Sequence, residues 1–192
     1  MNTDEANKDL LFSDEHIFSL RGQNVKSDAE GVHKQITGTD GNVQMASGYQ
    51  SILYLGDLED YRLNWYKSFY IIKYTSDNSE RFFPKMPMIR LSEMYLIAAE
   101  GWMEDDPEHA AELLQTLKQA RTKSIVNKQT VTEEMILLEM RKEFVGEGQL
   151  FYVYKRLNHD IIGNTSEDGV KASNRVFVLP LPEEEIEYGY RN

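Results

Sequence analysis

Three glutamates spaced four residues apart are the strongest candidates for chemistry in this sequence: Glu139, Glu143 and Glu147. Two carboxylates at a suitable distance could act as the acid and the base of a glycoside hydrolase. On one helix, however, this spacing places like charges on the same face, which is destabilising unless cations lie between them. Arg90, Arg141 and Lys142 are available for that purpose. We favour a structural ion-pair network between helices, because such networks often imitate active sites.

Other signatures of catalysis are missing from the sequence. Without cysteine, the chain has no thiolate metal site and no cysteine nucleophile. There is neither a phosphate-binding loop with its lysine nor a Gly-x-Ser-x-Gly elbow. The histidines are not spaced like metal ligands: His16, His33, His109 and His159. We therefore predict a protein that is not an enzyme and has no cofactor or metal ion.

The charge of the chain argues against two classes of partner. Its 192 residues include 21 lysines and arginines against 32 aspartates and glutamates, a net charge of -11. Nucleic acids and anionic lipid surfaces are bound through basic faces, so we predict neither as a partner. The longest uninterrupted apolar run, residues 94–99, is far shorter than the roughly 20 residues of a membrane-spanning helix.

Aromatic residues are the second notable feature, with 11 tyrosines, 8 phenylalanines and 2 tryptophans. An exposed ring can stack on the apolar face of a pyranose while neighbouring polar groups bind the sugar hydroxyls. Rings can equally be buried in a core, where they remove large apolar areas from water. In the loop-rich first part of the chain, we predict that Tyr61, Trp65 and Tyr66 are exposed and contact a ligand.

The elements that must position these residues fall into three stretches of one domain. Residues 1–86 are loop-rich, with short strands predicted at 15–20 and 69–74. Residues 87–158 have helical periodicity. Residues 159–192 form an extended C-terminal segment with a strand predicted at 175–179.

Two helices of the middle stretch are joined by a very short turn. The first is predicted at residues 88–103, and the second runs from Pro107 to about Lys123 with Asp106 as its N-cap. The short turn makes the two helices antiparallel neighbours. The apolar stripe of the first helix consists of Leu91, Met94, Tyr95, Ala98, Ala99 and Trp102.

A third helix is predicted to begin after the N-cap Thr132, and a fourth spans residues 149–158. The inward face of the third helix consists of Ile136, Leu137, Met140 and Phe144. We predict a mainly α fold of tetratricopeptide-like antiparallel helix pairs, with a loop-rich region and short strands. This likeness is one of geometry, because no 34-residue repeat recurs in the sequence.

Several segments together resemble the motifs of one known family. Residues 87–100 (PMIRLSEMYLIAAE) are similar to the signature helix of the SusD/RagB family, and residues 139–148 (EMRKEFVGEG) resemble its second signature. Shorter matches lie at residues 60–62, 73–74, 151–156, 179–182 and 185–186. Each piece is weak by itself, but their shared order along the chain is specific.

The resemblance implies a surface-exposed, outer-membrane lipoprotein that binds oligosaccharides or polysaccharides for nutrient uptake with a TonB-dependent transporter. It covers only the C-terminal part of the family's longer chains. We therefore expect a fragment of a larger fold, whose lipid anchor, its only link to the membrane, is absent from this chain. The alternative is a helical interaction module that docks on the transporter without binding a glycan itself.

The resemblance also bears on the charged residues of the helices. The two signature helices are chiefly structural in the family. The resemblance therefore implies that four charged residues form an interhelical network and not a ligand site. They are Arg90, Glu93, Arg141 and Glu143.

Overall fold

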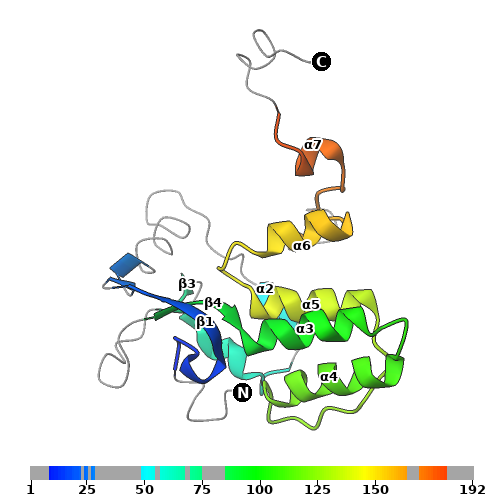
Figure 1. Ribbon diagram of the computed structural model, residues 1–192, viewed down its shortest axis with the longest axis horizontal. Helices are drawn as coiled ribbons and strands as arrows, with labels where there is room; N and C mark the ends of the chain where they lie inside the picture. Colours follow the sequence, from blue (N-terminus) through cyan, green and yellow to red (C-terminus); the bar gives the residue numbers. More distant parts are fainter. Residues whose placement is uncertain are drawn as a thin grey trace. The chain divides into compact units, whose positions relative to one another are not determined.

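A computed structural model describes residues 9–22, 24–25, 27–28, 49–54, 57–67, 70–74, 85–163 and 169–180. The chain forms two compact units, Met1–Gly148 and Gln149–Asn192. In its described part, the larger unit contains three long helices, a two-stranded sheet and several short elements (Figure 1).

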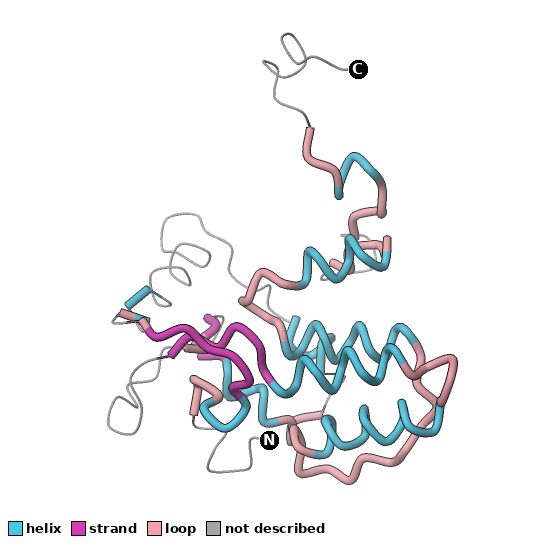
Figure 2. Tube along the Cα trace, in the orientation of Figure 1, coloured by secondary structure: helices cyan, strands magenta, loops and turns pink. Residues whose placement is uncertain are grey.

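The long helices of the larger unit are α3 (Leu91–Gly101), α4 (Pro107–Gln119) and α5 (Glu133–Glu143). α3 packs against both of the others and lies between them (Figure 2). The short turn after α3 reverses the chain, so that α3 and α4 form an antiparallel, tetratricopeptide-like pair. The prediction of a mainly α fold with such helix pairs is confirmed.

Local signals explain where α4 and α5 begin. The Asp106 carboxylate accepts a hydrogen bond from the His109 N–H at 3.0 Å, and Pro107 occupies the first turn. The Thr132 hydroxyl accepts one from the Met135 N–H at 3.3 Å. Both predicted N-caps are confirmed. The predicted inward face of α5 is also buried, namely Ile136, Leu137, Met140 and Phe144.

α3 differs from the prediction in its start and in its buried face. It begins at Leu91 and not at Met88, because residues 88–90 belong to a strand. Trp102, part of the predicted stripe, is 45% exposed. The helix is apolar around much of its circumference, so helical spacing alone could not select the covered face. The residues that α3 buries are Ser92, Leu96 and Ala99.

Strand β1 (His16–Arg21) pairs with strand β4 (Lys85–Arg90) in an antiparallel ladder. This pairing places His16 opposite Arg90, next to the start of α3. The strand predicted at residues 15–20 is confirmed apart from one residue at each end. The ladder therefore links the N-terminal part of the chain to the signature helix.

A second, smaller ladder replaces the strand predicted at residues 69–74. Strand β3 (Tyr70–Ile71) pairs with strand β2 (Tyr66–Lys67), and Lys73 and Tyr74 lie in a turn. The predicted strand is thus wrong in its second half.

Residues of the first stretch, 1–86, form a buried apolar core. Within this stretch, α2 packs against α5. Its other short elements are the 3₁₀ helices η2 (Ser13–Glu15) and η3 (Tyr61–Trp65), and α2 spans Tyr49–Tyr54. The rings of Phe12 and Trp65 meet edge to face, with centroids 5.1 Å apart. The buried apolar cluster consists of Leu11, Phe12, Val25, Leu53, Tyr54, Trp65, Tyr66, Ile71, Tyr74 and Val145.

The smaller unit contains α6 (Leu150–Leu157) and the short α7 (Asn174–Phe177). α6 confirms the fourth predicted helix. The strand predicted at residues 175–179 is wrong, because α7 occupies its first half. A strand needs a partner for its backbone groups, which the described residues do not supply there, whereas the helical turn buries Phe177. The ring of Phe177 packs 5.8 Å from that of Phe151.

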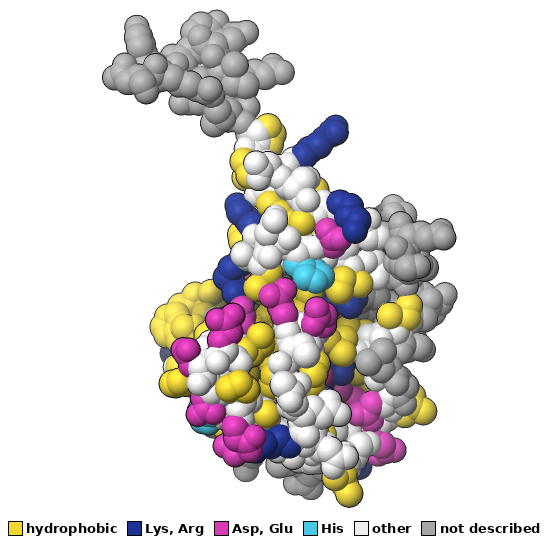
Figure 3. Space-filling model, turned by 90° about the vertical axis from the view of Figure 1, so that its right-hand side faces the viewer, with side chains coloured by type: hydrophobic (Ala, Val, Ile, Leu, Met, Phe, Trp, Pro, Cys, Tyr) yellow, Lys and Arg dark blue, Asp and Glu magenta, His cyan; other side chains and the backbone are white. Residues whose placement is uncertain are grey.

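The surface of the larger unit is rich in carboxylates. Figure 3 shows acidic side chains spread over its visible face, beside exposed hydrophobic ones. Exposed acidic residues at the α3–α4 turn include Glu104, Asp105, Asp106 and Glu108. Among the described residues, no helix has both the length and the apolar composition needed to cross a membrane.

Candidate functional site

Glu143, the last residue of α5, is fully buried at the centre of an ion network. Arg121 Nε lies 2.7 Å from Glu143 Oε1, and Arg62 Nη1 lies 3.2 Å from the same oxygen. Arg90 Nη1 lies 3.4 Å from Oε2. Burial raises the pKa of Glu143, but the charges of Arg121 and Arg62 outweigh burial and hold the pKa well below its usual range. The carboxylate is therefore ionised.

Glu15 of η2 closes the network from the N-terminal side of the chain. Its two carboxylate oxygens accept hydrogen bonds from Arg121 Nη1 and Nη2 at 2.8 and 2.9 Å. Arg90 Nη1 lies 3.8 Å from Oε2. The bidentate pair with Arg121 joins residues that are 106 positions apart, so it ties η2 to the end of α4.

Glu147 extends the network into the turn after α5. Its Oε1 accepts hydrogen bonds from Arg90 Nη2 at 2.7 Å, from the Tyr74 hydroxyl at 2.8 Å and from Lys73 Nζ. Lys73 is fully buried and also donates to the Glu143 carbonyl oxygen at 2.7 Å. Burial lowers the pKa of Lys73 to about 8, although the charge of Glu147 opposes the change.

Glu139 carries the network toward the surface. Arg62 Nη2 lies 2.8 Å from Glu139 Oε2, and Lys142 Nζ lies 3.0 Å from Oε1. Arg62 also donates to both carboxylate oxygens of Asp60, at 2.9 and 2.7 Å. Burial raises the pKa of Glu139, but the charges of Arg62 and Lys142 lower it below its usual value. All four side chains are buried.

This arrangement favours structure over catalysis for Glu139 and Glu143 of α5 and for Glu147, which lies in the turn after α5 and not on the helix as predicted. A catalytic carboxylic acid must reach the substrate and hold a proton near the working pH. The glutamates are instead enclosed by cations, which confirms the structural ion-pair network. Its acidic members are Glu15, Asp60, Glu139, Glu143 and Glu147, and its basic members are Arg62, Lys73, Arg90, Arg121 and Lys142.

Two residues that we expected in the network lie outside it. Arg141 is buried on α5, and within the described residues the ion pairs of the three glutamates come from other cations. Glu93 is partly buried near the start of α3, where burial raises its pKa. Among the described residues, its carboxylate forms no ion pair.

Sequence reasoning also missed cations that belong to the network. Arg62 and Lys73 stand in segments that resemble family motifs, whereas Arg121 stands in none. A buried arginine cannot be distinguished from a surface arginine by its neighbours in sequence. Membership of a family-like motif is therefore the one signal that the sequence offers for these cations.

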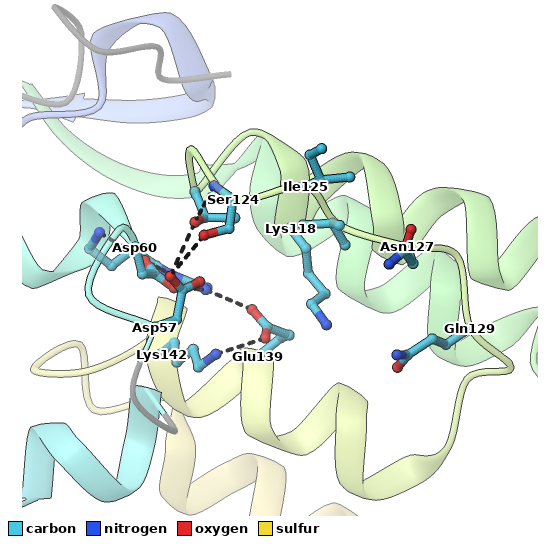
Figure 4. Close-up of a pocket in the computed structure, with 12 residues that line it drawn as sticks. Asp57, Asp60, Lys118, Ser124, Ile125, Asn127, Gln129, Glu139 and Lys142 are labelled. Atoms are coloured by element: carbon cyan, nitrogen blue, oxygen red, sulfur yellow. Dashed lines mark hydrogen bonds and ion pairs between the residues drawn. The ribbon is translucent and has the colours of Figure 1, made fainter.

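A polar pocket of about 240 Å³ lies beside Glu139 (Figure 4). Residues 57–62, the C-terminal half of α4, residues 122–129 and α5 form its walls. Apart from two apolar side chains, the lining consists of groups that donate or accept hydrogen bonds. The lining residues are Asp57, Asp60, Arg62, Lys118, Thr122, Ser124, Ile125, Val126, Asn127, Gln129, Glu139 and Lys142.

The outer wall of the pocket is a loop without regular structure, because α4 ends at Gln119 and not near Lys123 as predicted. Gln115 Nε2 donates to the Val126 carbonyl oxygen at 2.8 Å. Gln119 Oε1 accepts from the Val126 N–H at 3.0 Å, and Gln119 Nε2 donates to the Ser124 carbonyl oxygen at 3.1 Å. Side chains of α4 thus satisfy the backbone of the loop and hold this wall in place.

The three aromatic residues predicted to contact a ligand are not equally exposed. Trp65 is fully buried, with Lys73 Nζ 4.7 Å from its ring centroid. Tyr66 is also buried, and its hydroxyl lies 3.4 Å from that of Tyr54. The expected exposure of Trp65 and Tyr66 is therefore wrong, because the core covers their large rings. Tyr61 is only partly buried, and ligand contact by its ring stays a prediction.

The histidines that the structure describes have ordinary contacts. His16 Nε2 lies 2.7 Å from the Leu11 carbonyl oxygen, and His159 Nδ1 lies 2.7 Å from that of Asp160. His33 lies outside the described residues. Within the described part of the chain, no cluster of three or more histidine and carboxylate side chains could hold a metal ion.

Fold and network together define a helical protein of tetratricopeptide-like type. The family model of the SusD family matches residues 15–187, and the chain belongs to this family. The ordered motifs in the sequence are therefore those of a true member. No protein of curated function matches the chain.

Solved structures of SusD superfamily proteins have the same fold. One from Bacteroides thetaiotaomicron VPI-5482 has 24% sequence identity and a TM-score of 0.69 over 91% of this chain and 47% of its own. One from Bacteroides fragilis has 21% identity and a TM-score of 0.66, over 92% and 44%. A candidate sugar binding protein from Bacteroides vulgatus ATCC 8482 has 25% identity and a TM-score of 0.62, over 90% and 44%. The chain spans less than half the length of these proteins.

Proposed function

We propose that this chain is part of a non-catalytic protein that binds oligosaccharides or polysaccharides at the cell surface. The observation that carries the proposal is the SusD family match over residues 15–187. Family membership supports glycan binding in general, and one matched structure is of a candidate sugar binding protein. In this proposal, the complete protein lies on the outer membrane and takes up nutrients together with a TonB-dependent transporter.

The geometry of the larger unit is compatible with a glycan ligand. The polar pocket offers amide, hydroxyl and carboxylate groups of the kind that bind sugar hydroxyls. Tyr61 is partly buried and lies in the sequence between Asp60 and Arg62, which line the pocket, but its own side chain is not part of the lining. Hydrogen bonding and ring stacking require no net charge on the ligand, so an acidic protein can use both.

Calorimetric titration of the folded chain with a panel of neutral and acidic oligosaccharides tests this proposal. We expect binding to at least one glycan and an affinity about fivefold lower in Tyr61→Ala, because a lost aromatic contact costs about 1 kcal/mol. Tyr152→Ala is a matched control, since this tyrosine is 70% exposed and belongs to the smaller unit. The absence of heat with every glycan, from protein shown to be folded, would contradict the proposal.

The alternative is that this region docks on the transporter and does not bind the glycan itself. One observation favours it: the β1–β4 ladder exposes a group of apolar side chains of the kind that marks protein interfaces. They are Ile17, Phe18, Leu20 and Met88, with exposed fractions of 55%, 52%, 52% and 49%. Co-purification with the transporter that is lost in Phe18→Ser, with glycan binding absent throughout, would select this alternative.

A further inference from the structure

Among the described residues, Lys118 is a cation of the polar pocket whose side chain has no ion-pair partner. Lys118 lies on the last turns of α4, and Figure 4 shows it extending into the space between Glu139 and Gln129. It is partly exposed. Among the described residues, its ammonium group has no carboxylate within ion-pair distance and no hydrogen-bond acceptor.

The neighbouring carboxylates are already engaged. Glu139 is bound by Arg62 at 2.8 Å and by Lys142 at 3.0 Å, and Asp60 is bound by Arg62 at 2.7 Å. These contacts keep the two carboxylates of the pocket floor from competing for the charge of Lys118. The floor is therefore close to neutral, and the ammonium group of Lys118 is the cation left over.

The loop supplies uncharged partners on the facing wall. Asn127 and Gln129 line the pocket, are exposed, and form no side-chain hydrogen bond within the described residues. Figure 4 shows the Gln129 amide pointing toward the space that Lys118 enters. Since the bonds from α4 already hold the loop, these amides can bind a ligand without first ordering the backbone.

Asp57 occupies the opposite side of the pocket. Its Oδ1 accepts hydrogen bonds from the Glu59 N–H at 3.1 Å and from the hydroxyls of Thr122 and Ser124 at 3.4 Å. The carboxylate is partly exposed, so it can also accept a hydrogen bond from a ligand hydroxyl. The two ends of the pocket thus differ in charge: a free cation lies at one end and an acceptor at the other.

The size of the pocket limits what it can hold. Sites for drug-sized molecules have volumes of roughly 300–1,000 Å³, and this pocket has about 240 Å³. A single sugar ring or a small anion fits such a space, whereas a long stretch of a polysaccharide does not. A polysaccharide would have to insert a single sugar residue, or one of its ends, into the pocket.

We propose that the pocket binds one acidic sugar residue of a glycan, which carries a carboxylate or a sulfate ester. The anionic group pairs with Lys118, the amides of Asn127 and Gln129 donate to it or to adjacent hydroxyls, and Asp57 accepts from a hydroxyl at the other end. This inference rests on the proposed glycan-binding function and assigns the class of glycan.

The experiment uses the full chain and three tetrasaccharides of matched length. They are an oligogalacturonate, its carboxyl-reduced neutral form, and a sulfated galactan fragment. We expect the folded protein to bind one or both acidic probes at least about fivefold more tightly than the neutral probe, as one ion pair contributes about 1 kcal/mol. The probe that binds more tightly identifies the anionic group as carboxylate or sulfate.

Two variants connect the preference to the pocket. Lys118→Gln should bring the affinity for the acidic probe down to that for the neutral probe. Lys128→Gln is the matched control, because this lysine lies on the loop that forms the outer wall, pairs with Glu108 and Glu112, and does not line the pocket. It should retain the preference. Thermal unfolding of both variants verifies that they are folded.

The possible results separate this inference from the proposed function. Equal affinity for acidic and neutral probes, or a preference that survives Lys118→Gln, overturns the inference and leaves glycan binding intact. The same preference lost in both lysine variants also overturns it, because general surface charge would then be the cause. Failure to bind any glycan of the wider panel contradicts the proposed function itself.

Discussion

The ion network around Glu143 and the pocket around Lys118 meet at Glu139, but their polar side chains differ in pairing and in burial. In the network, each carboxylate contacts an arginine or a lysine, and the side chains are buried. In the pocket, Lys118, Asn127 and Gln129 lack such partners within the described residues and retain contact with water.

The difference has a physical reason. A buried charge is costly unless it is paired, so a closed network is stable only when all its members are present. A partly exposed polar group is solvated by water and costs little when it is unpaired. A cluster in which every buried charge is paired is therefore typical of a structural role. Polar groups that remain unpaired in a defined cavity are typical of a binding site.

The largest effect is expected from Glu143→Ala, which breaks the closed cluster at its centre. The change leaves Arg62, Arg90 and Arg121 buried with less counter-charge and should lower the free energy of unfolding by about 3–5 kcal/mol. Urea titration measures this loss. Glu133→Ala, at the exposed start of the same helix, should cost less than about 1 kcal/mol. A loss below about 0.5 kcal/mol in Glu143→Ala would mean that the cluster is not closed.

The second effect is a dependence on pH that comes from Lys73. Its pKa is about 8 in the folded chain and has the ordinary value of 10.5 in the unfolded chain. Between these values the unfolded chain binds more protons, so the free energy of unfolding should rise with pH. From pH 8 to pH 10, Lys73 by itself contributes a gain of about 2 kcal/mol. Tyr54 and Tyr74 reduce this gain close to pH 10, because burial raises their pKa values well above 10.0 in the folded chain and the unfolded chain loses these protons first.

Urea titrations across this pH range test the sign of the change. The rise should disappear in Lys73→Met, which removes the titrating group and keeps the length of the side chain. A wild-type profile that is flat or falls between pH 8 and pH 10 would show that Lys73 is not buried as a charged member of the network.

A smaller effect is expected at the wall of the pocket. Gln119→Ala removes the hydrogen bonds to Val126 and Ser124 and should cost about 1 kcal/mol of stability. The Val126 amide hydrogen should then exchange with solvent faster. Thr116→Ala, on the exposed face of the same helix, should leave that exchange rate unchanged. Equal protection of Val126 in both variants would mean that the loop is ordered without Gln119.

The smallest effect on stability is expected for Lys118→Gln. Because this side chain has no ion-pair partner in the described part of the chain, its loss should change the free energy of unfolding by less than about 0.5 kcal/mol. A loss above about 1 kcal/mol in urea would place Lys118 in a structural cluster and remove the contrast with the network.

Predictions from sequence were best where the signal is local. Asp106 and Thr132 cap their helices as predicted, because a cap depends only on the residues of the next turn. The apolar face of α5 was also predictable, since polar and charged residues occupy its other sides. The face of α3 was not, because that helix is apolar on most sides and its neighbours select what is buried.

In the candidate site, too, features with a local sequence signal were predictable and the others were not. The four-residue spacing of Glu139, Glu143 and Glu147 indicated a charged face that needs cations, and Arg90 was among the candidates. The partnership of Arg121 with Glu15 could not be read from the sequence, because it joins segments 106 positions apart. The pocket depends on where α4 ends and on how the next loop is held, and neither has a strong local signal.

The sequence by itself determined the starts of α4 and α5, the need for cations beside the glutamates, the lack of any cysteine chemistry and the family. Only the tertiary structure decided which cations pair with the glutamates, that Trp65 is buried, and that Lys118 faces an open pocket. Capping and helical spacing act within a few residues, whereas burial and ion pairing depend on segments that meet only after folding.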